Sequence, residues 1–119
     1  MSPSRIAASR QLADHAGVRF VTLEPTPEAQ DAYLPVDPAA RTLLAPQLCR
    51  ELGILPIAVQ DGTVLIASAE PVQYLPYDVA AALGGRPVSF VVTPADHLAR
   101  AMTERTGTQG AGQKGATQP

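Results

Sequence analysis

The sequence predicts an α+β fold, and three observations carry that prediction. Two apolar runs, at residues 54–59 and 63–67, are separated by Gln60-Asp61-Gly62, and an Asp-Gly pair between β-rich segments is typical of a hairpin. Segments of helical character precede and follow this hairpin. The chain has 119 residues, of which 45% are hydrophobic and 4% aromatic. This length and composition predict one compact domain with an aliphatic core.

The first predicted helix covers residues 4–16. It is alanine-rich, and Ile6, Ser9 and Ala13 recur on one side at helical spacing. This apolar stripe is narrow, which leaves self-association or domain swapping open. Gly17 ends the helix, and the alternating residues 18–23 predict a first strand.

A proline-rich loop at residues 24–36, with one helical turn at 27–32, is expected next. Asp37 precedes a proline, which is the pattern of a capping residue followed by the first helical position. The helix that it opens, at 39–44, is expected to be short because Pro46 would clash with the turn before it. A second short helix therefore begins at Pro46.

The second short helix ends at a glycine, and the hairpin follows it. The segments expected after the hairpin are an irregular connection fixed by Pro71 and Pro76, a helix at 77–83, a stop at Gly84-Gly85, a strand at 86–92, and a helix opened by Thr93-Pro94.

The inner order of these elements is βαββαβ, the arrangement of ferredoxin-like sandwiches. We therefore expect a mainly antiparallel sheet with helices on one face, preceded by an N-terminal helix. The predicted organisation is an N-terminal helix at 1–16, an α+β domain at 17–106 and a tail at 107–119. Apart from its final proline, the tail has no apolar residue larger than alanine, so it is expected to be disordered.

Charge and composition argue against several classes of protein. Nine basic and eleven acidic residues give a formal charge of −2, without the clustered basic patch of a nucleic-acid-binding surface. The N-terminus lacks the apolar core of a signal peptide, and no window approaches the ~20 apolar residues that span a bilayer. The prediction is a cytoplasmic chain that does not insert into a membrane.

Residues with catalytic or metal-binding potential are few. Cys49 is the only cysteine, so no intramolecular disulfide and no zinc site of paired cysteines is expected. Its mid-helix position favours a buried apolar role over a reactive thiol. His15 and His97 are both expected at the surface. Asp96 and His97 are adjacent in a helix and do not face each other.

Common catalytic motifs are absent. The sequence contains no GxxxxGK[ST], HExxH or GxSxG pattern, and its glycine pair follows a helix, where a dinucleotide site would need it before one. The carboxylates are scattered, with no spacing that forces two into one cleft. We therefore expect a non-enzyme with no cofactor and no metal.

Tyrosines are the strongest candidates for a binding surface. Tyr74 and Tyr77 flank the end of the proline-containing connection, and tyrosine is enriched at protein interfaces. The alternative is that both are ordinary half-buried residues at the edge of the sheet.

Three phrases resemble a known family: LADHAGVRFVTL, LLAPQLCRELGILPIAVQDGTVLIASAEP and DVAAALGGRPVSFVVTPADHLARAM. They are similar to the N-terminal domain of type II secretion and type IV pilus assembly ATPases, over about residues 11–106. A related domain is attached to bacterial membrane glycosyltransferases. Arg50, Leu55, Pro56 and Pro71 fall where the family pattern places them, whereas Glu70 stands in place of an aspartate.

The resemblance implies a non-catalytic protein–protein docking or regulatory domain, with Tyr74, Tyr77 and Arg50 as candidate partner-binding residues. Its expected partner is a membrane-platform component or the motor of a secretion or pilus system. The alternatives are a regulatory domain of a glycosyltransferase and a cyclic di-GMP-type nucleotide sensor. Some relatives bind cyclic di-GMP through paired Arg-Leu-Gly motifs upstream of this region. The first helix here offers only Arg5 and Arg10, so nucleotide binding is not carried over.

Overall fold

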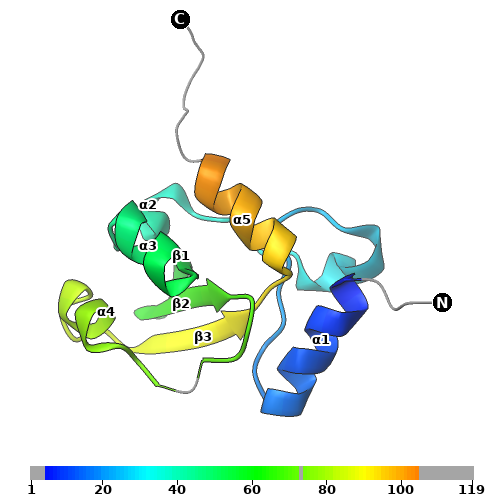
Figure 1. Cartoon of the computed structure of the whole chain (residues 1–119), viewed down its shortest axis with the longest axis horizontal. Helices are drawn as coiled ribbons and strands as arrows, with labels where there is room; N and C mark the ends of the chain where they lie inside the picture. The colour runs from blue at the N-terminus through cyan, green and yellow to red at the C-terminus, as the bar shows by residue number, and fades with distance from the viewer. Residues whose placement is uncertain (1–4, 73, 105–119) are drawn as a thin grey trace, which may run out of the picture.

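The computed structural model describes residues 5–72 and 74–104, and the predicted tail at 107–119 lies outside them. The α+β class is confirmed, and the fold is largely compatible with a ferredoxin-like sandwich (Figure 1). The elements are α1 (Arg5–Ala16), the 3₁₀ helix η1 (Pro27–Ala32), α2 (Pro38–Arg41), α3 (Pro46–Leu52), β1 (Ile54–Gln60), β2 (Thr63–Ser68), α4 (Tyr77–Ala82), β3 (Val88–Val92) and α5 (Ala95–Glu104).

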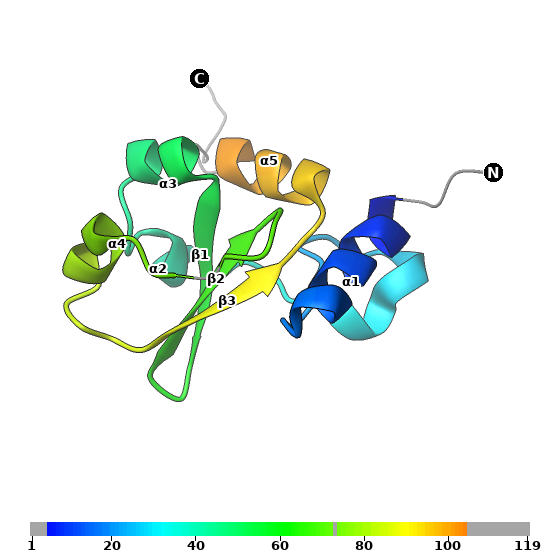
Figure 2. The same ribbon diagram turned by 60° about the horizontal axis from the view of Figure 1, so that its bottom comes forward.

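The sheet has the strand order β1-β2-β3 in the described part of the chain. Strands β1 and β2 pair antiparallel as the predicted hairpin, whereas β2 and β3 pair parallel across the α4 crossover. The sheet is therefore mixed, where a mainly antiparallel one was expected. Helices α3 and α5 lie side by side over one face of it (Figure 2).

The predicted strand at 18–23 does not join the sheet as a strand. This segment makes isolated bridges from Phe20 to Val92 and from Thr22 to Tyr33. Its backbone bonds β3 as far as residue 21, and then Thr22 bonds residues 32 and 34 in the loop instead. Because the segment divides its hydrogen bonds between two partners, it forms no continuous ladder.

The hairpin turn has the geometry that its sequence predicts. Asp61 and Gly62 both have positive φ, 52° and 81°, as a two-residue type I′ turn requires. The preceding strand carries an irregularity between Pro56 and Ala58. Every residue from 64 to 68 on the central strand is buried, so β2 is covered on both faces.

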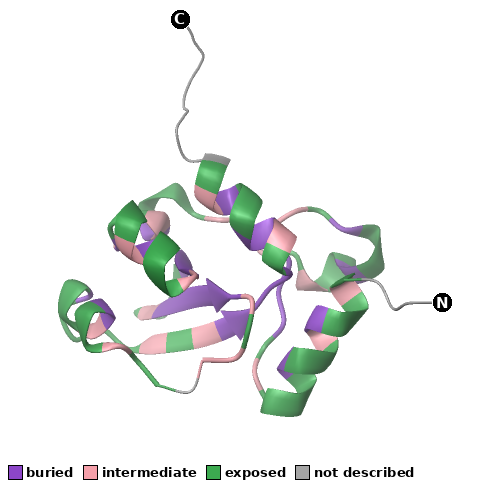
Figure 3. Cartoon of the chain, viewed as in Figure 1, coloured by how far each residue is buried: buried purple, intermediate pink, exposed green. Residues whose placement is uncertain are grey.

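Apolar residues form two clusters. The larger lies between the sheet and its helices, whereas the smaller lies under α1 and joins Ala13, Phe20, Ala29 and Val92. Figure 3 shows the strand ends buried and the outer helix faces exposed. Fully buried members of the larger cluster include Leu44, Ile57, Val64, Ile66, Val79 and Val91.

Two of the predicted helix signals are confirmed and one is wrong. The Asp37 carboxylate accepts a hydrogen bond from the Ala39 N–H at 3.0 Å, and Gly53 ends α3 in the left-handed region at φ 68°. The expected cap at Thr93 does not form, because its hydroxyl is buried with no hydrogen-bond partner among the described residues. Cys49 is buried in the core, as expected.

Replacing Thr22 with valine is expected to stabilise the domain. The Thr22 side chain is fully buried, and its hydroxyl meets no hydrogen-bond partner among the described residues. Valine has the same shape and removes the unsatisfied group, which favours the folded state by about 1 kcal/mol. Urea denaturation measures the change, and Thr42→Val, which removes a hydroxyl that donates to the Ala39 carbonyl at 2.8 Å, should show no such gain. An equal or lower stability of T22V would show that the hydroxyl is satisfied in solution.

Candidate functional site

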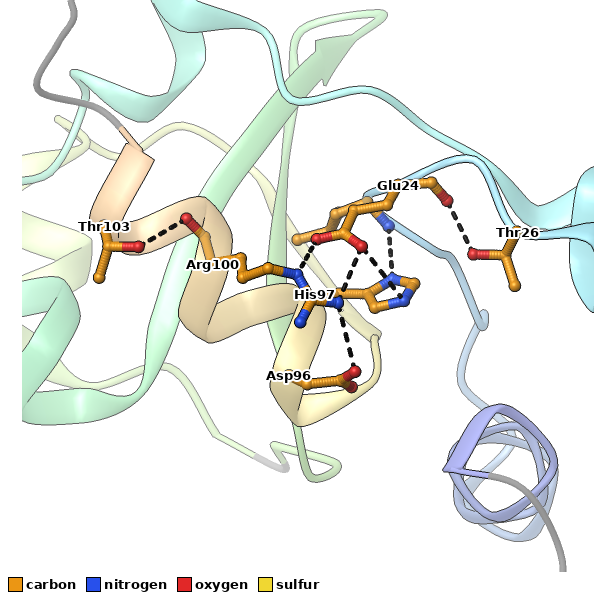
Figure 4. A network of polar contacts seen from close by, with 7 residues as sticks. Glu24, Thr26, Asp96, His97, Arg100 and Thr103 are labelled. Atoms are coloured by element: carbon orange, nitrogen blue, oxygen red, sulfur yellow. Dashed lines mark hydrogen bonds and ion pairs between the residues drawn. The ribbon is translucent and has the colours of Figure 1, made fainter.

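The main polar cluster of the described chain joins α5 to the chain at residues 23–24 (Figure 4). Glu24 comes from that segment, and Asp96, His97 and Arg100 come from α5. The Arg100 guanidinium donates through Nε and Nη2 to the two carboxylate oxygens of Glu24, the second at 2.8 Å. Its Nη2 also lies 3.3 Å from Asp96 Oδ2, one helical turn away. The result is a bidentate ion pair with a second carboxylate beside it.

His97 is at the centre of this cluster, and the surface position expected for it is wrong. Its side chain is 5% exposed. The ring Nδ1 accepts a hydrogen bond from the Leu23 N–H at 3.4 Å, and Nε2 lies 3.9 Å from Glu24 Oε1. The partner segment is 74 residues away in sequence, so local pattern gave no signal of this contact.

Arg100 helps to lower the pKa of both carboxyl groups. Hydrogen bonding from Arg100 is the main reason that the pKa of Glu24 is lowered, and it outweighs the opposing effect of burial. Burial works to raise the pKa of Asp96, but hydrogen bonds from its own N–H and from Arg100 outweigh burial and lower it. The bond to Glu24 raises the pKa of Arg100. Both carboxylates are therefore ionised at neutral pH.

The cluster is a structural tie between α5 and the chain near residue 24. Its donors and acceptors bond mainly to one another, and the Thr26 hydroxyl donates to the Glu24 carbonyl. Within residues 5–72 and 74–104, no three His, Cys, Asp or Glu side chains are placed to share a metal ion. This arrangement positions α5 against the chain near residue 24.

Acid is expected to weaken this tie. Glu24 and Asp96 have lowered folded pKa values, so their stabilisation is complete above the ordinary values of 4.5 and 3.8 and is lost as pH falls through the folded values. Glu24→Gln should remove part of the decline below about pH 4.5. The effect should stay under about 1 kcal/mol, because Glu24 and Arg100 are 34% and 51% exposed.

Urea denaturation between pH 7 and about pH 3 measures that slope. Glu28→Gln is the matched control, because Glu28 is exposed and forms no ion pair with another described residue. Equal acid slopes for the native chain and E24Q would contradict the assignment.

Tyr74 and Tyr77 are 76% and 83% exposed, so neither is a half-buried edge residue. Tyr77 is the first residue of α4 and Tyr74 lies in the connection before it. Tyr74 lines a surface groove of about 430 Å³, and the described residues of its walls carry no ionisable side chain other than the tyrosine. The other lining residues are Leu52, Ile54, Pro71, Val72, Pro76 and Phe90.

Arg50 is exposed in the last turn of α3. It borders a separate small cleft of about 20 Å³ with Arg41 and Met102. The structure therefore brings Tyr74 to an uncharged groove and leaves Arg50 outside it, although Leu52, two residues further on, is part of the groove wall.

A small α+β domain with an exposed uncharged groove is consistent with the family suggested by the sequence. The family model of the MshEN domain matches residues 16–112. Because this match covers most of the chain, the chain belongs to the MshEN domain family. No curated protein matches the chain by sequence.

Solved structures share the fold, among them MshE and the N-terminal domain of XpsE. The structure of MshE with cdg matches at 22% identity and a TM-score of 0.65, covering 83% of this chain and 66% of that one. The N-terminal domain of XpsE matches at 16% identity and a TM-score of 0.53, covering 83% and 64%. The chain thus spans just under two thirds of each. The resemblance to the N-terminal domain of secretion and pilus ATPases is confirmed. No described helix is long and apolar enough to cross a membrane.

Proposed function

We propose that this chain is a non-catalytic docking or regulatory domain of a bacterial secretion or pilus assembly ATPase system. Its partner is a component of the membrane platform or the motor itself, met on the cytoplasmic side. The observation that carries this proposal is a pair of exposed tyrosines, of which Tyr74 lines an uncharged groove and Tyr77 begins the helix that follows it.

The exposure of both tyrosines is notable because aromatic residues are scarce in this chain. The chain has three tyrosines, two phenylalanines and no tryptophan, yet Tyr74 and Tyr77 stand almost fully in solvent. An aromatic ring buries a large apolar area on binding and keeps a hydroxyl for a hydrogen bond. A groove without ionisable walls can be covered without desolvating a charge. Such a surface suits a protein partner.

A pull-down from the source cell's lysate, read by mass spectrometry, tests this function. The native chain should recover a secretion or pilus component, and the double variant Tyr74→Ser, Tyr77→Ser should recover much less of it. Val59→Ser, which changes an exposed apolar residue near the hairpin turn, is the matched control, and Arg50→Ser tests the third candidate. Recovery of a glycosyltransferase would move the domain to that branch. Equal recovery by all variants would refute the tyrosine surface.

A cyclic di-GMP-type sensor is the second candidate, favoured by the similarity to a structure of MshE with cdg. The basic residues of the first helix give it little support, because Arg10 lies 3.5 Å from Asp31 and 4.9 Å from the centre of the Phe20 ring. Calorimetric titration of the chain with cyclic di-GMP decides the matter. Saturable binding that Arg10→Ala abolishes would favour the sensor, and no measurable heat would favour docking.

A further inference from the structure

We propose that the outer edge of β3, at Val88 and Phe90, binds an extended, acid-flanked segment of another protein by strand addition. This site uses the backbone edge of the sheet and not the Tyr74 and Tyr77 side chains, although the Phe90 side chain also lines the groove beside Tyr74. The proposal rests on three observations. They are the direction in which each residue of β3 turns its backbone N–H and C=O groups, the point at which residues 19–21 stop pairing with β3, and the exposed arginines near the two ends of the open stretch.

The hydrogen bonds to β2 fix which residues of β3 face inward. Pro87 accepts a bond from the Val64 N–H, and Thr93 donates to the Ser68 carbonyl, each at 2.9 Å. Successive residues of a strand direct their backbone groups to opposite sides. The odd-numbered residues from 87 to 93 therefore bond β2, and the even-numbered ones face away from it.

The hydrogen bonds of Val92 confirm that the even-numbered residues face away from β2. The Val92 N–H donates to the Arg19 carbonyl and its own carbonyl accepts from Val21, both at 2.9 Å. Val88 and Phe90 point to the same side, and no other described residue bonds their outward N–H and C=O groups. Two donors and two acceptors are thus presented in register along one edge.

Residues 19–21, which bond the edge of β3 at Val92, do not continue along it toward Phe90 and Val88. The chain turns at Gly17, at φ 68°, and Val18 donates back to the Ala13 carbonyl, which directs the backbone into α1 instead of along β3. Figure 2 shows β3 running from below α4 toward α1, so that its start lies at the end of the strand away from α1. Val88 and Phe90 are half-buried and Ser89 is exposed, whereas the end of the strand is buried (Figure 3).

Edge strands are usually protected by pairing, by proline or by charge. Here Arg86 precedes the open stretch and Arg19 follows it along the covered part of the edge, and both are exposed. Neither forms an ion pair with another described residue. Two unpaired cations at the ends of an open edge repel a basic strand and attract one that carries Asp or Glu at each end. The two arginines therefore favour an extended segment with acidic residues at both ends as the partner of this edge.

The probe is a synthetic peptide of about six alternating valines and threonines, the usual length of a strand, with two glutamates at each end. Amide NMR of the full chain should show shifts centred on Val88, Ser89 and Phe90. Fluorescence anisotropy should show binding about tenfold tighter than for the lysine-flanked peptide, as expected for a few exposed charge pairs. A peptide with N-methylated central amides should not bind, because it cannot donate to the edge.

Matched variants separate charge from pairing. Arg86→Glu should remove the preference for the acidic peptide, whereas Arg50→Glu, which changes an exposed arginine on α3, should leave it unchanged. Tyr74→Ser, Tyr77→Ser should also leave peptide binding intact, so loss of the pull-down partner and loss of peptide binding are distinguishable. Equal affinity for the acidic and basic peptides, or equal binding of the N-methylated peptide, would overturn the proposal.

Hydrogen exchange of the free chain gives an independent test. The Val88 and Phe90 amides should exchange at least about tenfold faster than Ser89 and Val91, whose groups face β2. Protection of Val88 and Phe90 in the free chain would mean that the edge is already covered and would refute the site. Protection that appears only at high protein concentration would assign the edge to a second copy instead.

Discussion

Ile66→Asp is expected to abolish the cooperative unfolding transition. Ile66 is fully buried on the central strand, between Pro56 on one neighbour and Phe90 on the other. An aspartate there would be a charge without a partner, and its burial costs several kcal/mol. Against a total stability of about 5–15 kcal/mol, the loss leaves little folded protein. Circular dichroism during heating should show no sharp transition.

Val59→Asp is the matched control for this result. Val59 lies on the first strand of the same hairpin, but its side chain is 44% exposed near the turn. The same charge placed there stays in water, so the melting temperature should change little. A soluble Ile66→Asp variant that melts like Val59→Asp would show that the hairpin is not the centre of the core.

Local chemistry allowed much of the fold to be predicted. The Asp61-Gly62 turn, the Asp37 cap and the stop at Gly53 depend only on residues within a few positions of each other, and these signals were sufficient. The exposed positions of Tyr74 and Tyr77 were one of two interpretations, because exposure depends on packing that the sequence does not state.

Long-range contacts limited the rest. The 18–23 segment has a strand-like pattern. Its pairing is incomplete because β3 and residues 32–34 each take part of its backbone hydrogen bonds. Likewise, the open edge at Val88 and Phe90 follows from the path of α1 and not from the residues of β3. The polar cluster around Glu24 joins positions that no spacing rule connects.

The buried histidine gives the second large effect. His97→Leu fills a similar volume but removes the acceptor of the Leu23 N–H. A buried donor left without a partner costs about 1–3 kcal/mol, so the free energy of unfolding should fall by about that amount. His97→Asn should lose less, since its side-chain oxygen can stand near the position of Nδ1 and keep the bond.

Two measurements together decide whether this bond holds α5 in place. Urea denaturation gives the stability of the native chain, H97L and H97N, and hydrogen exchange gives the protection of the Leu23 amide in each. Protection should fall in H97L and be largely kept in H97N, because local exchange reports the loss of that one bond separately from global stability. If H97L matched the native chain in both measurements, the cluster would be held by the Glu24–Arg100 pair alone, and the histidine would act only by its volume. The expected order, native above H97N above H97L, instead makes the Leu23–His97 hydrogen bond a second contact between α5 and residues 23–24, beside the Glu24–Arg100 pair.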